Sequence, residues 1–372
     1  MDQLTDINPV ERRLVDKANA AWIPISSSFE LTPLCNLKCD MCYVRMEQSE
    51  VKQAGGLRSA DEWLHTAEEL RQAGTLFLLL TGGEPLLYPG FADLYLRLKE
   101  MGFILTLNTN ATLITEEWAQ LFQRQKPRRI NVTLYGGSNE TYESLCHVSN
   151  GFDRCMNGLR LLKAHGIDVK LNLTLLKKNR NDFSRLLEIG RTLDIPVSTS
   201  SYMSVFCSKT CTSQLEIPRI RMSADDVAKI DVEYLKYKKG DDYPAYACEM
   251  GNFLKHDIPT ASEGQGLTCR AGKSSCWINW QGIMTPCVDM AAPAVSLAET
   301  SVAEAWKKIT DERKNLPLHT ECAGCALRPV CDVCYANASN EKAHCGNLHY
   351  LCDIAKAKKE LLIRESNRYE TK

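Results

Sequence analysis

Three cysteines stand close together near the start of the chain. Cys35, Cys39 and Cys42 form a C-x3-C-x2-C pattern. Three thiolates on one short loop can bind three irons of a [4Fe–4S] cluster. The fourth iron is then left without a protein ligand, and an open metal position is where a substrate or cofactor binds. The alternatives are a zinc site with a distant fourth ligand, or a set of buried thiols.

A glycine-rich turn follows the next apolar stretch of the sequence. It consists of Gly82, Gly83, Glu84 and Pro85. Two glycines allow the backbone to approach a ligand closely, and the Glu84 carboxylate can accept a hydrogen bond from an ammonium group. Taken alone, these four residues could equally form an ordinary turn.

Together, the cysteine loop and the glycine-rich turn resemble the signature of radical S-adenosylmethionine (SAM) enzymes. The resemblance implies a [4Fe–4S] cluster on the first three cysteines, with the open iron binding the amino and carboxylate groups of SAM. It also implies that the reduced cluster passes one electron to SAM. This gives methionine and a 5′-deoxyadenosyl radical, which removes a hydrogen atom from the substrate. An external one-electron reductant of the flavodoxin or ferredoxin type is expected as a partner.

The resemblance extends the SAM site to the ends of later strands. The third cysteine is usually preceded by an aromatic residue in this family, whereas here it is preceded by Met41, whose polarizable side chain is expected near the adenine. Asn108, Thr109 and Asn110 stand at the end of the third expected strand, where the family contacts the ribose. The residues expected to bind SAM are Gly82, Gly83, Glu84, Pro85, Asn108, Thr133, Asn172 and Met41. For the strand-end residues, turn formation or barrel filling is the alternative.

A second group of cysteines occupies the last third of the chain and resembles the SPASM extension of radical SAM proteins. The resemblance implies two auxiliary [4Fe–4S] clusters, and hence three clusters in all. The first auxiliary cluster is expected on Cys269, Cys276, Cys287 and Cys334, and the second on Cys322, Cys325, Cys331 and Cys352. Cys322, Cys325, Cys331 and Cys334 form the quartet of this extension. The family has three residues between the last two cysteines of the quartet, and this chain has two.

Different ligand sets stay open for these cysteines. Cys345 could replace Cys352, Cys276 could be free and leave an iron open, or the quartet could be a zinc knuckle. Cys207 and Cys211 lie just past the sixth expected strand and could contact the substrate.

The composition agrees with metal binding inside a cell. The chain has 372 residues, 17 cysteines and a formal net charge of -1. It begins without an apolar signal segment, so we expect a cytoplasmic protein whose thiols stay reduced. The near-zero charge gives no reason to expect nucleic acid or membrane as a partner.

The secondary-structure elements expected to position these residues alternate regularly along the chain. Six short apolar strands alternate with helices, and such alternation predicts a parallel sheet. The expected fold is α/β, a partial (β/α)6 barrel of the TIM type, with its chemistry at the carboxyl ends of the strands. The expected domains are an N-terminal arm 1–25, a radical SAM core 26–230, a linker 231–265, and a cysteine-rich SPASM domain 266–372 with a C-terminal helix.

The resemblance favours a peptide substrate, modified by a thioether or carbon–carbon crosslink or by oxidation, as in the maturation of ribosomally made peptides. About 25 residues precede the first strand, so a separate leader-recognition protein, or direct leader binding, is expected. Sulfatase maturation by formylglycine formation is an alternative. In that branch a proton-accepting Asp directly follows the cysteine equivalent to Cys287, whereas here Val288 intervenes and Asp289 is the candidate. Oxidation of a small molecule and a non-enzymatic role as an iron–sulfur electron carrier stay open as well.

Overall fold

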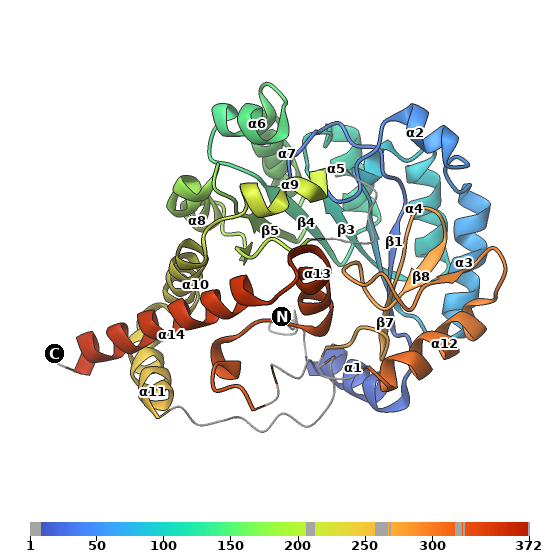
Figure 1. Ribbon diagram of the computed structural model, residues 1–372. Coiled ribbons are helices and arrows are strands. Elements are labelled where there is room, and N and C mark those ends of the chain that lie inside the picture. The colour runs from blue at the N-terminus through green and yellow to red at the C-terminus, as the bar shows by residue number, and fades with distance from the viewer. Residues whose placement is uncertain are drawn as a thin grey trace.

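The computed structural model describes residues 9–205, 213–256, 267, 269–316, 322 and 324–370. Its centre is one nine-stranded sheet in the order β6-β5-β4-β3-β2-β1-β7-β8-β9. Strands β1 to β7 are parallel, and β8 and β9 continue the sheet in antiparallel fashion. Figure 1 shows α10, α11 and α14 lying together at one end of the molecule. Within the described residues, no helix combines the length and apolarity that crossing a bilayer requires.

The strands are β1 Ser26–Glu30, β2 Phe77–Thr81, β3 Ile104–Thr109, β4 Arg129–Leu134, β5 Val169–Thr174, β6 Val197–Ser200, β7 Ser275–Ile278, β8 Ile283–Thr285 and β9 Val295–Ser296. The α-helices are α1 Pro9–Ala21, α2 Gln48–Gln53, α3 Ala60–Gln72, α4 Phe91–Glu100, α5 Glu116–Arg124, α6 Asn139–Cys146, α7 Gly151–Ala164, α8 Phe183–Thr192, α9 Ser213–Ile220, α10 Ala224–Lys239, α11 Tyr243–Lys255, α12 Val302–Lys314, α13 Tyr335–Cys345 and α14 His349–Glu370.

The predicted α/β fold with a parallel-sheet core is confirmed. The six expected strands are β1 to β6, and each is followed by at least one helix. Helix α3 begins with a capping box, in which Ser59 Oγ accepts from Glu62 N at 3.2 Å and Glu62 accepts in return from Ser59 N. Local signals of this kind fix where a helix begins.

The sheet continues past the region in which a separate small domain was expected to begin. Strand β7 pairs with β1, so β1 has a parallel neighbour on each side. The segment expected as a linker, 231–265, is helical in much of its described part, where α10 ends and α11 follows. Both helices pack against α14. The domain boundaries given above remain predictions.

The middle strands have one apolar and one polar face. In β3 and β4, Leu107 and Val132 are fully buried, and they alternate with half-buried polar residues such as Asn108 and Thr133. Side chains of successive strand residues point to opposite faces. The polar residues of neighbouring strands therefore share one face of the sheet.

Helix α1 is tied to the sheet by an ion pair. Arg128 donates to both carboxylate oxygens of Glu11, at 3.0 and 2.7 Å. This hydrogen-bonded pairing with Arg128 lowers the pKa of Glu11. A carboxyl group with a lowered folded-state pKa stabilises the fold above its unfolded pKa, and the contribution is lost as the pH falls through the folded pKa.

We therefore expect Glu11→Gln to lower the free energy of unfolding by about 1 kcal/mol at neutral pH. The difference between the two proteins should shrink as the pH falls below the unfolded-state pKa of about 4.3. It should vanish once the pH lies below the lowered folded-state pKa, where Glu11 is protonated in both states. Denaturant unfolding of both proteins at several pH values measures it. A difference that stays constant with pH would contradict the assignment.

Candidate functional site

The cysteine loop begins a few residues after β1, at the carboxyl end of that strand. Backbone N–H groups donate to two of its sulfurs, from Leu37 to Cys35 Sγ at 3.4 Å and from Arg45 to Cys42 Sγ at 3.2 Å. Such N–H···S contacts stabilise a thiolate and tune a bound cluster. The donor set therefore fits a [4Fe–4S] cluster.

In the described part of the chain, no three His, Cys, Asp or Glu side chains are placed to hold a single metal ion. A [4Fe–4S] cluster takes one thiolate at each ligated iron, so its ligands stand farther apart than those of one ion.

The carboxyl end of α6 braces the cysteine loop. Lys38 N donates to Cys146 O at 2.9 Å, and Asp40 N donates to Leu145 O at 3.1 Å. Burial raises the pKa of Asp40, but Lys178 and His147 outweigh it and hold that pKa below its usual value. The loop is thus fixed by both backbone and charged contacts before any cofactor binds.

The glycine-rich turn packs directly on the cysteine loop. Gly83 N donates to Thr32 O at 2.7 Å, and Glu84 N donates to Leu34 O at 2.8 Å. A Cβ added at Gly83 would lie 2.5 Å from Leu34 O, and one at Gly82 would lie 2.5 Å from Thr32 O. The close approach that requires glycine here is to the backbone of the cysteine loop.

Gly83→Ala should therefore displace the cysteine loop. We expect a loss of about 1–3 kcal/mol in unfolding free energy and a lower iron content after anaerobic reconstitution. Gly137→Ala is the matched control, because its Cβ meets only the flexible Arg185 side chain. Iron assay and thermal unfolding of both variants test this, and equal iron content in the two would contradict it.

Glu84 is fully buried and already has hydrogen-bond donors. Its carboxylate accepts from Thr109 Oγ1 at 2.8 Å, from Asn110 N at 2.9 Å and from Leu86 N at 3.2 Å. Burial raises the pKa of Glu84 to about 7, and these donors oppose the rise. Glu84 thus ties the end of β2 to the end of β3, and the expected acceptance from an ammonium group stays a prediction.

Asn110 connects Glu84 to the cysteine loop. Its amide nitrogen donates to Asn36 Oδ1 at 3.0 Å and contacts Cys35 Sγ at 3.8 Å. Asn110 belongs to the stretch Asn108 to Asn110 in which the family resemblance places the ribose contact, and that contact stays a prediction. The repeated polar residues Asn108, Thr109 and Asn110 at the end of an apolar strand are the signal in the sequence for this connection.

The expected ribose and cleft residues lie together on the polar face of the sheet. Asn108 accepts from Asn131 Nδ2 at 2.8 Å, and Asn172 accepts from Ser198 Oγ at 2.6 Å. Thr133 is the register partner of Asn172. The polar side chains of three adjacent strands thus meet on one surface.

Met41 and Pro85 are buried. Met41, only 6% exposed, belongs to the main hydrophobic core. Pro85 starts a short 3-10 turn. Neither of them lines the large cleft described next.

A cleft of about 1200 Å³ opens beside the cysteine loop. Cys39 and Cys42 lie on one wall, and residues of the β7–β8 hairpin, including Trp277 and Trp280, lie on the other. Its charged lining residues are Glu30, Asp40, Glu47, Glu50, Glu216, Lys38 and Arg45. Carboxylates thus outnumber cations, and the aromatic wall adds an apolar contact surface.

Asp289 lies between the two cysteine groups. Burial raises the pKa values of Tyr43 in the first loop and of Cys287 in the second group, and the Asp289 charge raises both further. Its neighbours Val288 and Met290 line the cleft. The candidate proton acceptor is thus adjacent in the chain to two residues of the cleft wall and is not itself among the residues that line the cleft.

Three of the four cysteines expected on the first auxiliary cluster are associated. Cys287 and Cys334 pack on the same small apolar cluster of Leu267, Met290 and Ala336. After burial, charges that include those of Cys334 and Cys269 raise the pKa of Cys287. The fourth, Cys276, belongs to the main hydrophobic core instead.

The second expected set also has members that lie together. Cys322 and Cys352 pack on the apolar cluster of Ala338, Leu348 and Leu351. Burial raises the pKa of Cys331, and the Cys322 charge adds to it. Cys325 follows in a turn, in which its N–H donates to Cys322 O.

The remaining candidate cysteines lie elsewhere. Cys345 is not among the sulfurs that pack with Cys322. Cys352 packs on the same apolar cluster as Cys322, and the choice between Cys352 and Cys345 as the ligand stays a prediction. Cys207 and Cys211 are outside the described residues.

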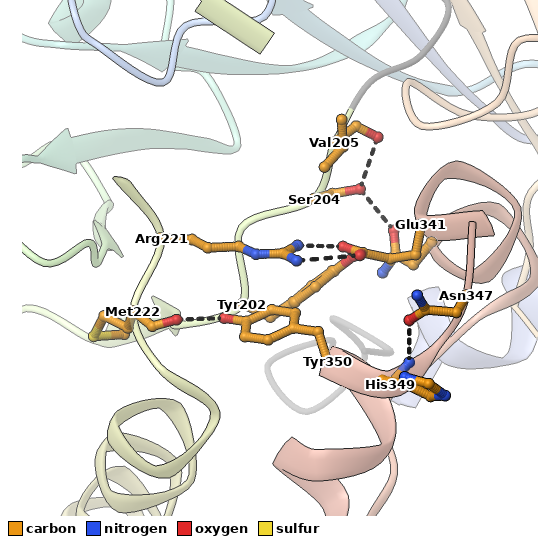
Figure 2. A network of polar contacts seen from close by, with 10 residues as sticks. Tyr202, Ser204, Val205, Arg221, Met222, Glu341, Asn347, His349 and Tyr350 are labelled. Atoms are coloured by element: carbon orange, nitrogen blue, oxygen red, sulfur yellow. Dashed lines mark hydrogen bonds and ion pairs between the residues drawn. The ribbon is translucent and has the colours of Figure 1, made fainter. Parts of the chain in front are cut away.

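A buried ion pair joins the sheet to the downstream cysteines (Figure 2). Arg221 donates to the Glu341 carboxylate on α13, and the two side chains are 8% and 1% exposed. The Tyr202 hydroxyl donates to the same carboxylate at 3.0 Å, and the Arg221 guanidinium lies 3.6 Å from the centre of the Tyr350 ring. Nothing in the local sequence indicates this pair.

These polar contacts extend to Cys334, one of the expected cluster ligands. Ser204, just past β6, donates to Asn337 Oδ1 at 3.2 Å. The backbone N–H of Asn337 in turn contacts Cys334 Sγ at 3.5 Å. The position of this sulfur relative to the sheet therefore depends on side chains of α13.

Comparisons with known proteins agree with this arrangement. Residues 29–189 match the family model described as the Radical SAM superfamily. The chain is similar to an AdoMet-dependent heme synthase of Methanosarcina barkeri, with 25% identity covering 84% of this chain and 91% of that protein. It is also similar to the sporulation killing factor maturation protein SkfB of Bacillus subtilis, with 22% identity over 82% of this chain and 69% of that protein. Among solved structures, anSMEcpe with bound AdoMet superposes with a TM-score of 0.67 at 17% identity, covering 93% of this chain and all of that chain.

Proposed function

Residues 29–189 make this chain a radical SAM enzyme, and from that premise we propose that it modifies a peptide bound in the cleft beside the cysteine loop. The observation that carries the proposal is the cleft itself. It brings Cys39 and Cys42 to the same cavity as the aromatic residues of the β7–β8 hairpin. A substrate held there has its reacting atom close to the cofactor loop.

The charge of the cleft favours a peptide over a polyanionic substrate. Five carboxylate residues line it against two cationic ones, Lys38 and Arg45. Arg45 already pairs with Glu47 at 2.5 Å. The negative charge of the cleft attracts a basic peptide and does not repel a neutral one, whereas it repels a substrate that carries four carboxylates.

The proposed cofactors are SAM and three [4Fe–4S] clusters, one of them on Cys35, Cys39 and Cys42. When bound, SAM and the first cluster supply the 5′-deoxyadenosyl radical. The chain's own residues position these groups. The Leu37 and Arg45 amides hold the sulfurs, while Glu84 and Asn110 fix the loop against β3. Asp289, which stands between two residues that line the cleft, is the proposed proton acceptor.

We also propose an external one-electron reductant of the flavodoxin or ferredoxin type and a leader-recognition protein as partners. The auxiliary clusters would relay electrons between the substrate and that reductant. About 12 irons per chain are expected after reconstitution. About four would contradict the auxiliary assignment.

Anaerobic incubation with dithionite and SAM tests the radical chemistry. The reconstituted protein should form 5′-deoxyadenosine, and a peptide substrate should lose hydrogen mass in the same reaction. Short peptides encoded beside the gene are the first to test, by co-expression and mass spectrometry. Absence of 5′-deoxyadenosine with all clusters loaded would favour a role as an electron carrier.

A porphyrin is the second candidate substrate, because a heme synthase matches almost the whole length of the chain. Titration of the holoprotein with a carboxylated iron porphyrin discriminates the two. A shifted Soret band, together with a mass change of the porphyrin after turnover, would replace the peptide proposal. An unshifted band would support it.

A further inference from the structure

Two side chains from outside the cysteine loop contact the sulfur of Cys39. One is the thiol of Cys146, the last residue of α6, and the other is the hydroxyl of Tyr135, which directly follows β4. Both form hydrogen bonds with the Cys39 side chain. The environment of this sulfur therefore depends on two further elements of the fold.

Backbone hydrogen bonds hold the end of α6 against Cys39. Lys38 N donates to Cys146 O at 2.9 Å, and Asp40 N donates to Leu145 O at 3.1 Å. Cys39 stands between the two residues that donate, so it faces the end of the helix. Cys146 is fully buried, and Cys39 packs on the same hydrophobic core. The two sulfurs thus meet away from bulk water.

Tyr135 is fixed by contacts of its own. Its backbone N–H donates to Tyr142 Oη at 3.3 Å, and Asn179 Nδ2 donates to its backbone oxygen at 2.7 Å. Its ring meets the Tyr142 ring edge to face, with 6.1 Å between the ring centres. Burial raises the pKa of Tyr135, and the charge of Cys39, followed by those of three more cysteines, raises it further. The hydroxyl therefore lies among the sulfurs of the loop.

The chemistry of a ligated cysteine decides which group donates. In the chain without a cluster, the hydrogen bond with Cys146 and burial raise the pKa of Cys39, and the Tyr135 hydroxyl, which donates to Cys39, opposes the rise. A cysteine bound to iron is a thiolate and carries no hydrogen. The hydrogen between the two sulfurs then belongs to Cys146, so both the Cys146 S–H and the Tyr135 O–H donate to Cys39.

The two donors act from the side of Cys39 that faces away from the cleft. Cys39 lines the cleft, whereas neither Tyr135 nor Cys146 is among the lining residues. They therefore leave the cleft side of the sulfur open to the cofactor and the substrate.

We propose that Tyr135 and Cys146 are positioning residues that set the reduction potential of the first cluster through the Cys39 sulfur. Hydrogen bonds to a ligand sulfur stabilise the reduced cluster more than the oxidised one, because the reduced cluster carries one more negative charge. Both residues thus favour the transfer of one electron from the reductant to the cluster. The inference rests on the proposed function, because it needs the first cluster.

A redox titration of the full-length holoprotein tests this, with dithionite as reductant and EPR to follow the signal that SAM alters. In Tyr135→Phe and in Cys146→Ala, the ratio of reduced to oxidised first cluster at a fixed potential should fall at least about threefold. For one electron this is a shift of about 30 mV to a more negative potential. Cys146→Ser keeps a donor and should keep the ratio of the unaltered protein. An unchanged ratio in Tyr135→Phe or in Cys146→Ala would overturn the inference for that residue.

Two matched variants control for changes in packing. Tyr95→Phe removes a buried hydroxyl that donates to Gln125 O at 2.6 Å, far along the chain from the loop. Cys155→Ala removes a fully buried thiol of α7 that is hydrogen-bonded to Tyr142. Both should leave the ratio unchanged. A fall as large as that in Tyr135→Phe would mean that loosening the core alone moves the potential, and would overturn the inference.

Iron content separates a donor from a ligand. All five variants should keep the iron content of the unaltered protein, and a loss of about four irons in Cys146→Ala would make Cys146 a ligand and overturn the inference. An unaltered protein without a SAM-sensitive EPR signal would overturn the proposed function itself. With that signal present, unchanged ratios in the variants overturn only the role of Tyr135 and Cys146.

Discussion

Replacing Cys35 with alanine is expected to reduce 5′-deoxyadenosine formation to background and to remove about four irons per chain. The Cys35 sulfur receives donors from the Leu37 backbone and the Asn110 side chain, so its place in the loop is fixed. A cluster with two protein ligands in place of three would be lost or would no longer hold SAM. Iron assay, EPR and product analysis by liquid chromatography measure the effect.

Cys248→Ala is the control for this variant. Cys248 is a half-buried thiol whose sulfur contacts Ser366 O at 3.9 Å, at the packing of α11 on α14. It has the same chemistry and no cluster assignment. Iron content and SAM cleavage should match those of the unaltered protein. If Cys35→Ala retained full SAM cleavage, the assignment of the cysteine loop to the radical-forming cluster would fail.

Arg221→Met is expected to lower the free energy of unfolding by about 3–5 kcal/mol. Removing one partner of a buried pair leaves the other charge without compensation in a medium of low polarity. Glu341 is 1% exposed in its side chain, and the donors that remain to it are the neutral Tyr202 hydroxyl and the Cys345 thiol. The cation contact with the Tyr350 ring is lost as well.

Two further variants separate charge from packing. Arg219→Met, two residues earlier, removes an exposed arginine whose pair with Glu216 is 80% and 53% exposed, and it should cost no more than about 1 kcal/mol. The double variant Arg221→Met with Glu341→Met removes both charges and should recover most of the loss. Urea unfolding of the four proteins measures this. A double variant as unstable as Arg221→Met alone would contradict the charge argument.

Most of the fold could be predicted from local sequence patterns. The six short strands expected from the sequence are β1 to β6 of the structure. In β3 and β4 the buried residues Leu107 and Val132 alternate with polar ones, and this period of two can be read from the local sequence. Ser59 with Glu62 is a local pattern too, and it marks the start of α3. By contrast, β7 was not predicted. This short segment becomes a strand because it pairs with the edge of β1. A pairing between residues so far apart in the chain leaves no local sequence pattern.

The candidate site likewise has one part that local sequence patterns predict and another part that depends on long-range contacts. The spacing of Cys35, Cys39 and Cys42 is local and could be read directly. The face on which Cys276 points depends on a strand register with residues 249 positions away. The Arg221–Glu341 pair likewise joins positions 120 residues apart. Contacts of this kind follow from the topology, which a single sequence does not specify.

The pairing of β1 with both β2 and β7 has a consequence for how the protein folds during translation. Ser27 and Cys276 are 249 positions apart, so a ribosome needs about 12 to 50 s to make the segment between them. Throughout that time one edge of β1 has no strand beside it and can pair with another nascent chain. The second edge of β1 is therefore covered only late in translation. The cysteine loop that follows β1 is braced by Leu145, Cys146 and Lys178, which are made well before β7.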